Sequence, residues 1–201
     1  MKIAVIGANG MIGSQIVSEA LSRKHQVTAY TRSGTQIEGT TSVALELTNT
    51  STVAKAINSH DFTVITVASR DNYQAAIDAH TALIHAAPTG RFLIVGGAGS
   101  LEINGTRLYE TPDFPSDYSV EARTFGQILD LYRSAPTDVQ WTIAAPSPEI
   151  APATRTGRYI LGSDSPVGDF VSTQDFAIAI IDEAEKKQNL RRRFTVATEQ
   201  A

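Results

Sequence analysis

Three glycines recur at every third position near the amino terminus: Gly7, Gly10 and Gly13. They follow an apolar run at residues 3–6 and precede residues 11–23, where apolar side chains recur with helical spacing. A strand, a glycine turn and a helix start form a phosphate cradle, because the free N–H groups and positive dipole end of a helix favour anions. Gly7 permits a tight turn, Gly10 lets the backbone approach a pyrophosphate, and Gly13 lets the helix pack close to the strand.

The residues after the predicted second strand, at 25–31, distinguish between dinucleotides. An acidic residue at this point usually binds the ribose 2′-hydroxyl of NAD, whereas this chain has Arg32 and Ser33. A guanidinium matches the geometry of a phosphate, and the serine hydroxyl can donate a hydrogen bond to it. The sequence therefore predicts a preference for NADPH and leaves NADH open.

The residues for acid–base catalysis are sparse. None of the six tyrosines has lysine four residues later, so the Tyr-x-x-x-Lys pair that interconverts ketones and alcohols is missing. Hydride transfer to a flavin requires mainly stacking and orientation, because the cofactor and the flavin carry the chemistry. Ser100 is the candidate to hydrogen-bond a substrate or fix the nicotinamide, and a turn-stabilising role for this serine is equally open.

Strands and helices alternate along almost the whole chain. We expect strands at 2–6, 25–31, 42–47, 62–67, 91–95, 139–144 and 194–197, and helices at 11–23, 51–58, 72–87, 116–134 and 171–187. This alternation predicts an α/β fold, a Rossmann-type doubly wound parallel sheet with helices on both faces. We expect residues 1–201 to form a single NAD(P)-binding domain. Two segments at about 97–118 and 146–170 follow strand ends, where such sheets bind ligands, and are predicted to be substrate loops.

Composition narrows the partners of the protein. The 201 residues carry a net charge of −4, with 42% hydrophobic residues and no cysteine. We therefore expect no nucleic-acid partner, no membrane span, no metal site and a cytoplasmic location. A small-molecule acceptor is the expected partner, and the chain is expected to be a monomer or a homodimer.

The sequence resembles a known family in four stretches: GANGMIG at 7–13, TR at 31–32, FTVITVASR at 62–70 and APSPE at 145–149. These are similar to atypical short-chain dehydrogenases/reductases, and more narrowly to the NAD(P)H-binding family of proposed NADH-flavin reductases. That family is related to biliverdin reductase B and to NmrA-like proteins.

The resemblance implies a set of cofactor-binding residues. The pyrophosphate would lie on Gly7, Asn9, Gly10, Met11, Ile12 and Gly13, and the adenosine end on Arg32, Ser33, Glu46 and Leu47. The ribose would lie beside Ala68, Ser69 and Arg70, and the nicotinamide beside Gly97 to Ser100 and Ala145, Pro146 and Ser147. The family has Asp where this chain has Glu46.

Two classes of function agree with these features. The first is an NAD(P)H-dependent reductase of flavin-reductase type, for which a flavin is a substrate rather than a tightly bound cofactor. The second is a redox sensor of NmrA type that binds NADP(H) without turnover and reports it to a protein partner. A nucleotide-sugar epimerase agrees less well, because the Tyr-x-x-x-Lys pair is missing.

Overall fold

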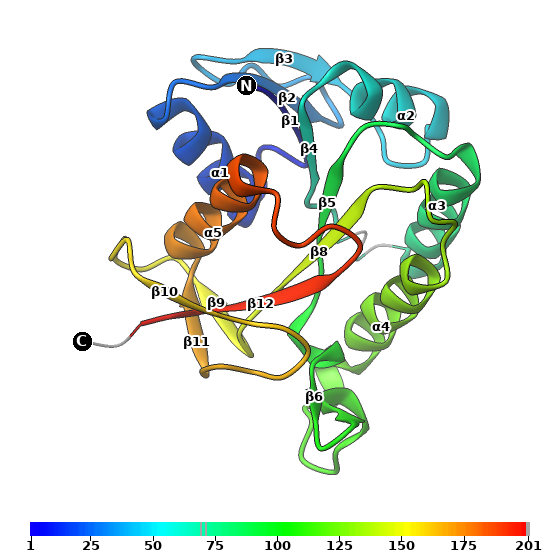
Figure 1. Ribbon diagram of the computed structural model, residues 1–201, viewed down its shortest axis with the longest axis vertical. Helices are drawn as coiled ribbons and strands as arrows, with labels where there is room; N and C mark the ends of the chain where they lie inside the picture. Colours follow the sequence, from blue (N-terminus) through cyan, green and yellow to red (C-terminus); the bar gives the residue numbers. More distant parts are fainter. Residues whose placement is uncertain (69, 71, 200–201) are drawn as a thin grey trace.

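One sheet forms the centre of the computed structural model, which describes residues 1–68, 70 and 72–199. Its strands are β1 (Lys2–Ile6), β2 (Gln26–Thr31), β3 (Thr41–Ala44), β4 (Phe62–Ile65), β5 (Phe92–Val95), β8 (Trp141–Pro146), β10 (Tyr159–Gly162) and β12 (Arg193–Thr198). They lie in the order β10-β12-β8-β5-β4-β1-β2-β3 (Figure 1). All neighbouring pairs are parallel except β10 with β12. The predicted Rossmann-type sheet is confirmed.

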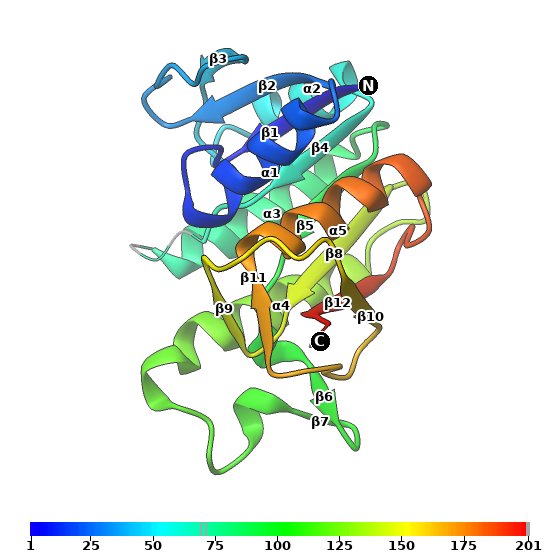
Figure 2. The ribbon, with the colours of Figure 1, turned by 90° about the vertical axis from the view of Figure 1, so that its left-hand side faces the viewer.

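Helices cover both faces of the sheet, α1 and α5 on one and α2, α3 and α4 on the other (Figures 1 and 2). Their bounds are α1 (Met11–Ser22), α2 (Thr50–Ser59), α3 (Tyr73–Ala86), α4 (Ser119–Arg133) and α5 (Thr173–Lys186). None of the helices in the described ranges combines the length and apolar composition needed to cross a membrane.

Strand β1 is buried on both of its faces, which explains why its sequence does not alternate between apolar and polar residues. Ile3 and Val5 belong to the core cluster under α1 and α5, whereas Ala4 and Ile6 belong to the cluster under α2, α3 and α4. A strand that is buried on both faces uses apolar residues throughout.

Most predicted bounds differ from the structure by one or two residues at an end, and two differ by three residues. Strand β3 ends at Ala44, three residues earlier than expected, because the chain turns at Glu46, whose carbonyl accepts from the Asn49 N–H at 3.0 Å. The predicted helix at 116–134 begins as a short 3₁₀ turn, η3 (Ser116–Tyr118), and becomes α-helical only at Ser119.

The two predicted substrate loops contain short elements of their own. The first holds η1 (Ala98–Ser100), the β6 (Glu102–Ile103) and β7 (Thr106–Arg107) hairpin, η2 (Leu108–Glu110) and η3. The second holds β9 (Glu149–Ala151), β10 and β11 (Phe170–Ser172), with β9 and β11 paired in parallel. The first loop projects at one end of the molecule, as Figure 2 shows.

A buried histidine between α3 and α4 gives folding a pH dependence. His80 is 1% exposed, and its Nδ1 lies 3.0 Å from the Tyr132 hydroxyl. Burial disfavours the imidazolium and lowers the pKa of His80 from 6.5 to about 4. Below pH 6.5 His80 is therefore protonated in the unfolded chain but stays neutral in the folded chain. The free energy of unfolding consequently falls as the pH decreases toward 4.

We expect acidification from pH 7 to pH 5 to lower the free energy of unfolding by about 2 kcal/mol through the titration of His80. His80→Gln lacks this titration and keeps a group that can hydrogen-bond Tyr132. Urea unfolding at both pH values should therefore show a smaller loss on acidification for the variant than for the wild type. Equal losses in the two proteins would show that His80 does not titrate in this way.

Candidate active site

The turn after β1 depends on Gly7. Its φ of +91° lies in the region that favours glycine. A Cβ there would lie 2.4 Å from the Thr66 carbonyl oxygen, at the end of the neighbouring strand β4. The Gly7 N–H donates to the Tyr30 carbonyl at 2.9 Å. The turn is therefore held between the ends of β2 and β4.

The other two glycines have different tasks. A Cβ at Gly13 would lie 2.1 Å from the Gly7 carbonyl oxygen, so the first turn of α1 packs directly on the glycine turn. Sequence reasoning had instead predicted that Gly13 allows the helix to pack close to the first strand. Gly10 is the N-cap of α1, with φ −72° and ψ 169°, and a Cβ there would meet only the Gly7 carbonyl oxygen, at 3.3 Å. The outer side of Gly10 is therefore open.

The start of α1 suits an anion. No side chain caps the helix, and its first turn contains no acidic residue. The first N–H groups of an α-helix have no acceptor within the helix, and the positive dipole end adds to their attraction for phosphate. Asn9, Gly10 and Met11 are exposed around this point. The cradle therefore fits the pyrophosphate of a dinucleotide.

The predicted adenosine side lies at the same edge of the sheet. Strand β2 pairs in parallel with β1, with Tyr30 opposite Ile6, so Arg32 and Ser33 follow β2 close to the glycine turn. Both residues are exposed, and the Ser33 hydroxyl lies 2.7 Å from the Thr35 hydroxyl.

The two expected residues after β3, Glu46 and Leu47, lie in different environments. Glu46 is exposed, whereas Leu47 is buried and belongs to the core cluster under α2, α3 and α4. The side chain of Glu46 is therefore accessible to a ligand, and that of Leu47 is used in packing.

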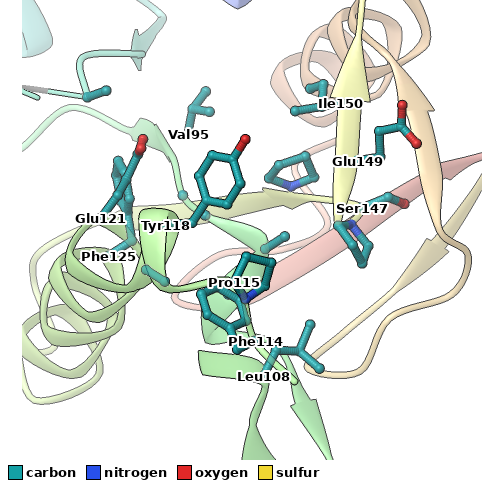
Figure 3. Close-up of a pocket in the computed structure, with 18 of the residues that line it drawn as sticks. Val95, Leu108, Phe114, Pro115, Tyr118, Glu121, Phe125, Ser147, Glu149 and Ile150 are labelled. Carbon is teal, nitrogen blue, oxygen red and sulfur yellow. The ribbon is translucent and has the colours of Figure 1, made fainter. Parts of the chain in front are cut away.

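A cleft of about 730 Å³ opens beside the glycine loop, along the carboxyl ends of the strands. Its lining includes nine of the residues expected at the cofactor: Met11, Ile12, Ala68, Arg70, Gly97, Ala98, Gly99, Pro146 and Ser147. Both predicted substrate loops contribute walls, one around Phe114 and Pro115 and the other around Ile150 (Figure 3). The structure therefore brings the strand ends and the two loops to one cavity.

The first predicted substrate loop, 97–118, included Tyr118, but sequence reasoning missed that the cleft wall continues along α4. Tyr118, Glu121, Ala122 and Phe125 all line the cleft. Their spacing of three, four and seven residues places them on one helical face. Tyr118 is 63% exposed, and Figure 3 shows its ring in the cleft, on the wall opposite Ile150. The signal was present in the sequence as an i, i+3, i+4, i+7 pattern that could equally belong to a core-facing stripe.

Ser100 lies apart from the cleft lining. It is 3% exposed, and its hydroxyl donates to the Gly97 carbonyl at 3.0 Å. The buried Arg193 guanidinium donates to the same hydroxyl at 3.1 Å and to the Ser100 carbonyl at 2.6 Å. This geometry favours the turn-stabilising role that the sequence left open beside the catalytic one.

Other expected residues occupy contrasting positions. Arg70 is 72% exposed, and its Nε lies 3.3 Å from a carboxylate oxygen of Glu121 on α4. Ala145 is fully buried in β8, and the Ser147 hydroxyl donates to the Val196 carbonyl at 2.8 Å. Ser69, expected beside the ribose, lies outside the described residues.

The sheet order and the glycine turn at the first strand define a dinucleotide-binding protein of Rossmann type. The model of the NAD(P)H-binding family matches residues 7–187, and the chain belongs to this family.

Relatives of known sequence or structure agree with this assignment. The uncharacterized protein YwnB of Bacillus subtilis is 36% identical, over 99% of each chain. A proposed NADH-flavin reductase from Streptococcus pneumoniae superimposes with a TM-score of 0.91 at 30% identity, covering 99% of this chain and 100% of the other. A proposed epimerase from Bacteroides thetaiotaomicron superimposes with a TM-score of 0.87 at 30% identity, covering 100% and 98%.

Proposed function

We propose that this protein is an oxidoreductase that uses NADPH in preference to NADH to reduce a flat acceptor, such as a flavin or a quinone. The observation that carries the proposal is the open, largely apolar cleft that adjoins the glycine loop at the carboxyl edge of the sheet. A sensor that only binds the dinucleotide has no need of such a cavity. The description of the Streptococcus pneumoniae relative as a proposed NADH-flavin reductase supports the same reaction class.

The cofactor would span the edge of the sheet. Gly7, Asn9, Gly10, Met11, Ile12 and Gly13 would hold its pyrophosphate, Arg32 and Ser33 its 2′-phosphate, Glu46 and Leu47 its adenine side, and Ala68 and Arg70 its ribose. The backbone around Gly97, Ala145, Pro146 and Ser147 would border the nicotinamide, which supplies hydride when it is bound.

The cleft walls would orient the acceptor. Tyr118, Phe114 and Phe125 offer aromatic rings, and Pro115 and Ile150 offer apolar surface around the same space. Such surfaces bind a planar ring by stacking and burial and exclude water from the hydride path. Holding two reactants face to face supplies most of the rate enhancement that this chemistry requires, because it makes the step effectively unimolecular.

Arg32 tests the preference for NADPH. We expect Arg32→Ala to weaken NADPH binding by about 1–3 kcal/mol through the loss of a charge-assisted contact, with little effect on NADH. Fluorescence titration with both dinucleotides measures the two affinities. Arg158→Ala, which removes an exposed arginine from the second substrate loop, serves as a charge-matched control. Equal losses of NADPH and NADH affinity in Arg32→Ala would rule out a 2′-phosphate contact.

Tyr118 tests the location of the acceptor. We expect Tyr118→Ala to raise KM for riboflavin about fivefold, because an aromatic stacking contact contributes about 1 kcal/mol. Tyr118→Phe keeps the ring and should behave like the wild type, and NADPH affinity should be the same in all three proteins. An unchanged KM in Tyr118→Ala would place the acceptor elsewhere.

A further inference from the structure

The charged residues of the cleft walls are almost all acidic. Residues 108–122, which form the wall from η2 to α4, contain four carboxylates and no Lys, Arg or His. Residues 146–154 of the opposite wall contain one carboxylate and again no basic residue. The five acidic residues are Glu110, Asp113, Asp117, Glu121 and Glu149. Three of them, Asp113, Glu121 and Glu149, line the cleft itself.

The cleft offers little positive charge to a ligand. Among the described lining residues the one basic side chain is Arg70, and its guanidinium lies 3.3 Å from the Glu121 carboxylate. Glu121 and Glu149 stand on opposite walls, as Figure 3 shows, so acidic groups border the cavity from both sides. An anionic substituent in this space would approach carboxylates and would find its nearest guanidinium already paired.

We propose that the acceptor is an uncharged planar molecule, and that the cleft discriminates against acceptors with a phosphate or carboxylate group. This inference rests on the proposed function, because it specifies the acceptor class of the same site. Phosphate recognition in proteins generally uses Arg or Lys side chains or a free helix N-terminus. The helix that begins at the cleft, α4, carries the acidic Glu121 in its first turn, which opposes the attraction of the helix start for an anion. At the acceptor end the walls offer carboxylates instead, and like charges repel most strongly where salt is low.

Riboflavin and FMN test this proposal as a matched pair, because they share the isoalloxazine ring and differ by one phosphate. We expect kcat/KM with NADPH to be at least tenfold higher for riboflavin than for FMN at low ionic strength. Added salt should reduce this ratio by screening the exposed carboxylates. Equal kcat/KM values, or a higher value for FMN, would overturn the proposal.

A charge-reversal variant links the discrimination to the cleft wall. Asp113→Lys should lower the riboflavin-to-FMN ratio several-fold, since it places a cation where Asp113 lines the cleft. Asp138→Lys makes the same change in charge at an exposed position before β8, on the opposite edge of the sheet, and should leave the ratio unchanged. An equal effect of both variants would assign the preference to net charge and overturn the role of the wall.

The failure of this inference can be distinguished from failure of the proposed function. If neither flavin nor a simple quinone is reduced, the proposed reaction is wrong. Quenching of flavin fluorescence in the presence of NADP⁺ then still compares the two affinities. Tighter binding of riboflavin by tenfold or more would uphold the discrimination, and equal or tighter binding of FMN would overturn it.

Discussion

Gly10→Asp should weaken dinucleotide binding strongly without harming the fold. Aspartate is a preferred N-cap residue, and the φ of −72° and ψ of 169° at Gly10 suit it, so helix α1 should be as stable as before or slightly more stable. The same side chain would fill the open side of Gly10 and place a carboxylate where the pyrophosphate must approach. We expect NADPH affinity to fall by about 100-fold or more, equivalent to about 2.7 kcal/mol.

Two comparisons make this result specific to the anion. Gly10→Ser adds a neutral N-cap side chain, so its loss of NADPH affinity should be smaller, about tenfold. Thermal unfolding of both variants, measured without ligand, should match or exceed the wild type. Titration calorimetry that found wild-type NADPH affinity in Gly10→Asp would contradict the placement of the pyrophosphate at α1.

Glu183→Gln should destabilise the fold by about 3–5 kcal/mol, because it leaves a buried guanidinium without its counter-ion. The Glu183 carboxylate on α5 accepts a hydrogen bond from Arg91, the residue before β5, and the two side chains are 3% and 8% exposed. For a chain of this size, such a loss corresponds to a decrease in Tm on the order of 10 °C.

Removing the other partner gives the matched comparison. Glu183 also accepts from the Asn189 N–H at 2.9 Å, from the Asn189 side-chain amide at 2.7 Å and from the Gln188 N–H at 3.3 Å. In Arg91→Met the carboxylate keeps these three donors, so the loss in the free energy of unfolding should be smaller than in Glu183→Gln. Calorimetric or urea unfolding measures both, and a loss below about 1 kcal/mol in Glu183→Gln would refute the stabilising role of this pair.

The main sheet could be predicted because its signals are local. Continuous apolar runs such as residues 3–6 and 92–95 predict strands that are buried on both faces, and their alternation with helices predicts the parallel order. The pairings of β9 with β11 and of β10 with β12 could not be predicted. Strands β9, β10 and β11 have three or four residues each, and the paired strands lie about 20 to 40 residues apart in the chain.

Part of the candidate site could likewise be predicted from local sequence signals, and part could not. The glycine loop could be predicted, because each glycine meets a steric demand set within a few residues or by the adjacent strand. The cleft wall of Glu121 and Phe125 on α4 could not, because a helical stripe does not reveal whether it faces a core or a cavity. The partner of Ser100 was also hidden, since Arg193 reaches it from the last strand, 93 residues away.

Rapid mixing of the protein–NADPH complex with riboflavin under anaerobic conditions tests the central claim most directly. The absorbance bands of reduced nicotinamide and oxidised flavin are followed together in a single turnover. We predict that both bands decay at the same rate and in equal amounts, and that the decay is absent in Gly10→Asp. Tight NADPH binding with no loss of either band, for riboflavin and for a simple quinone alike, would contradict the reductase and favour a dinucleotide sensor.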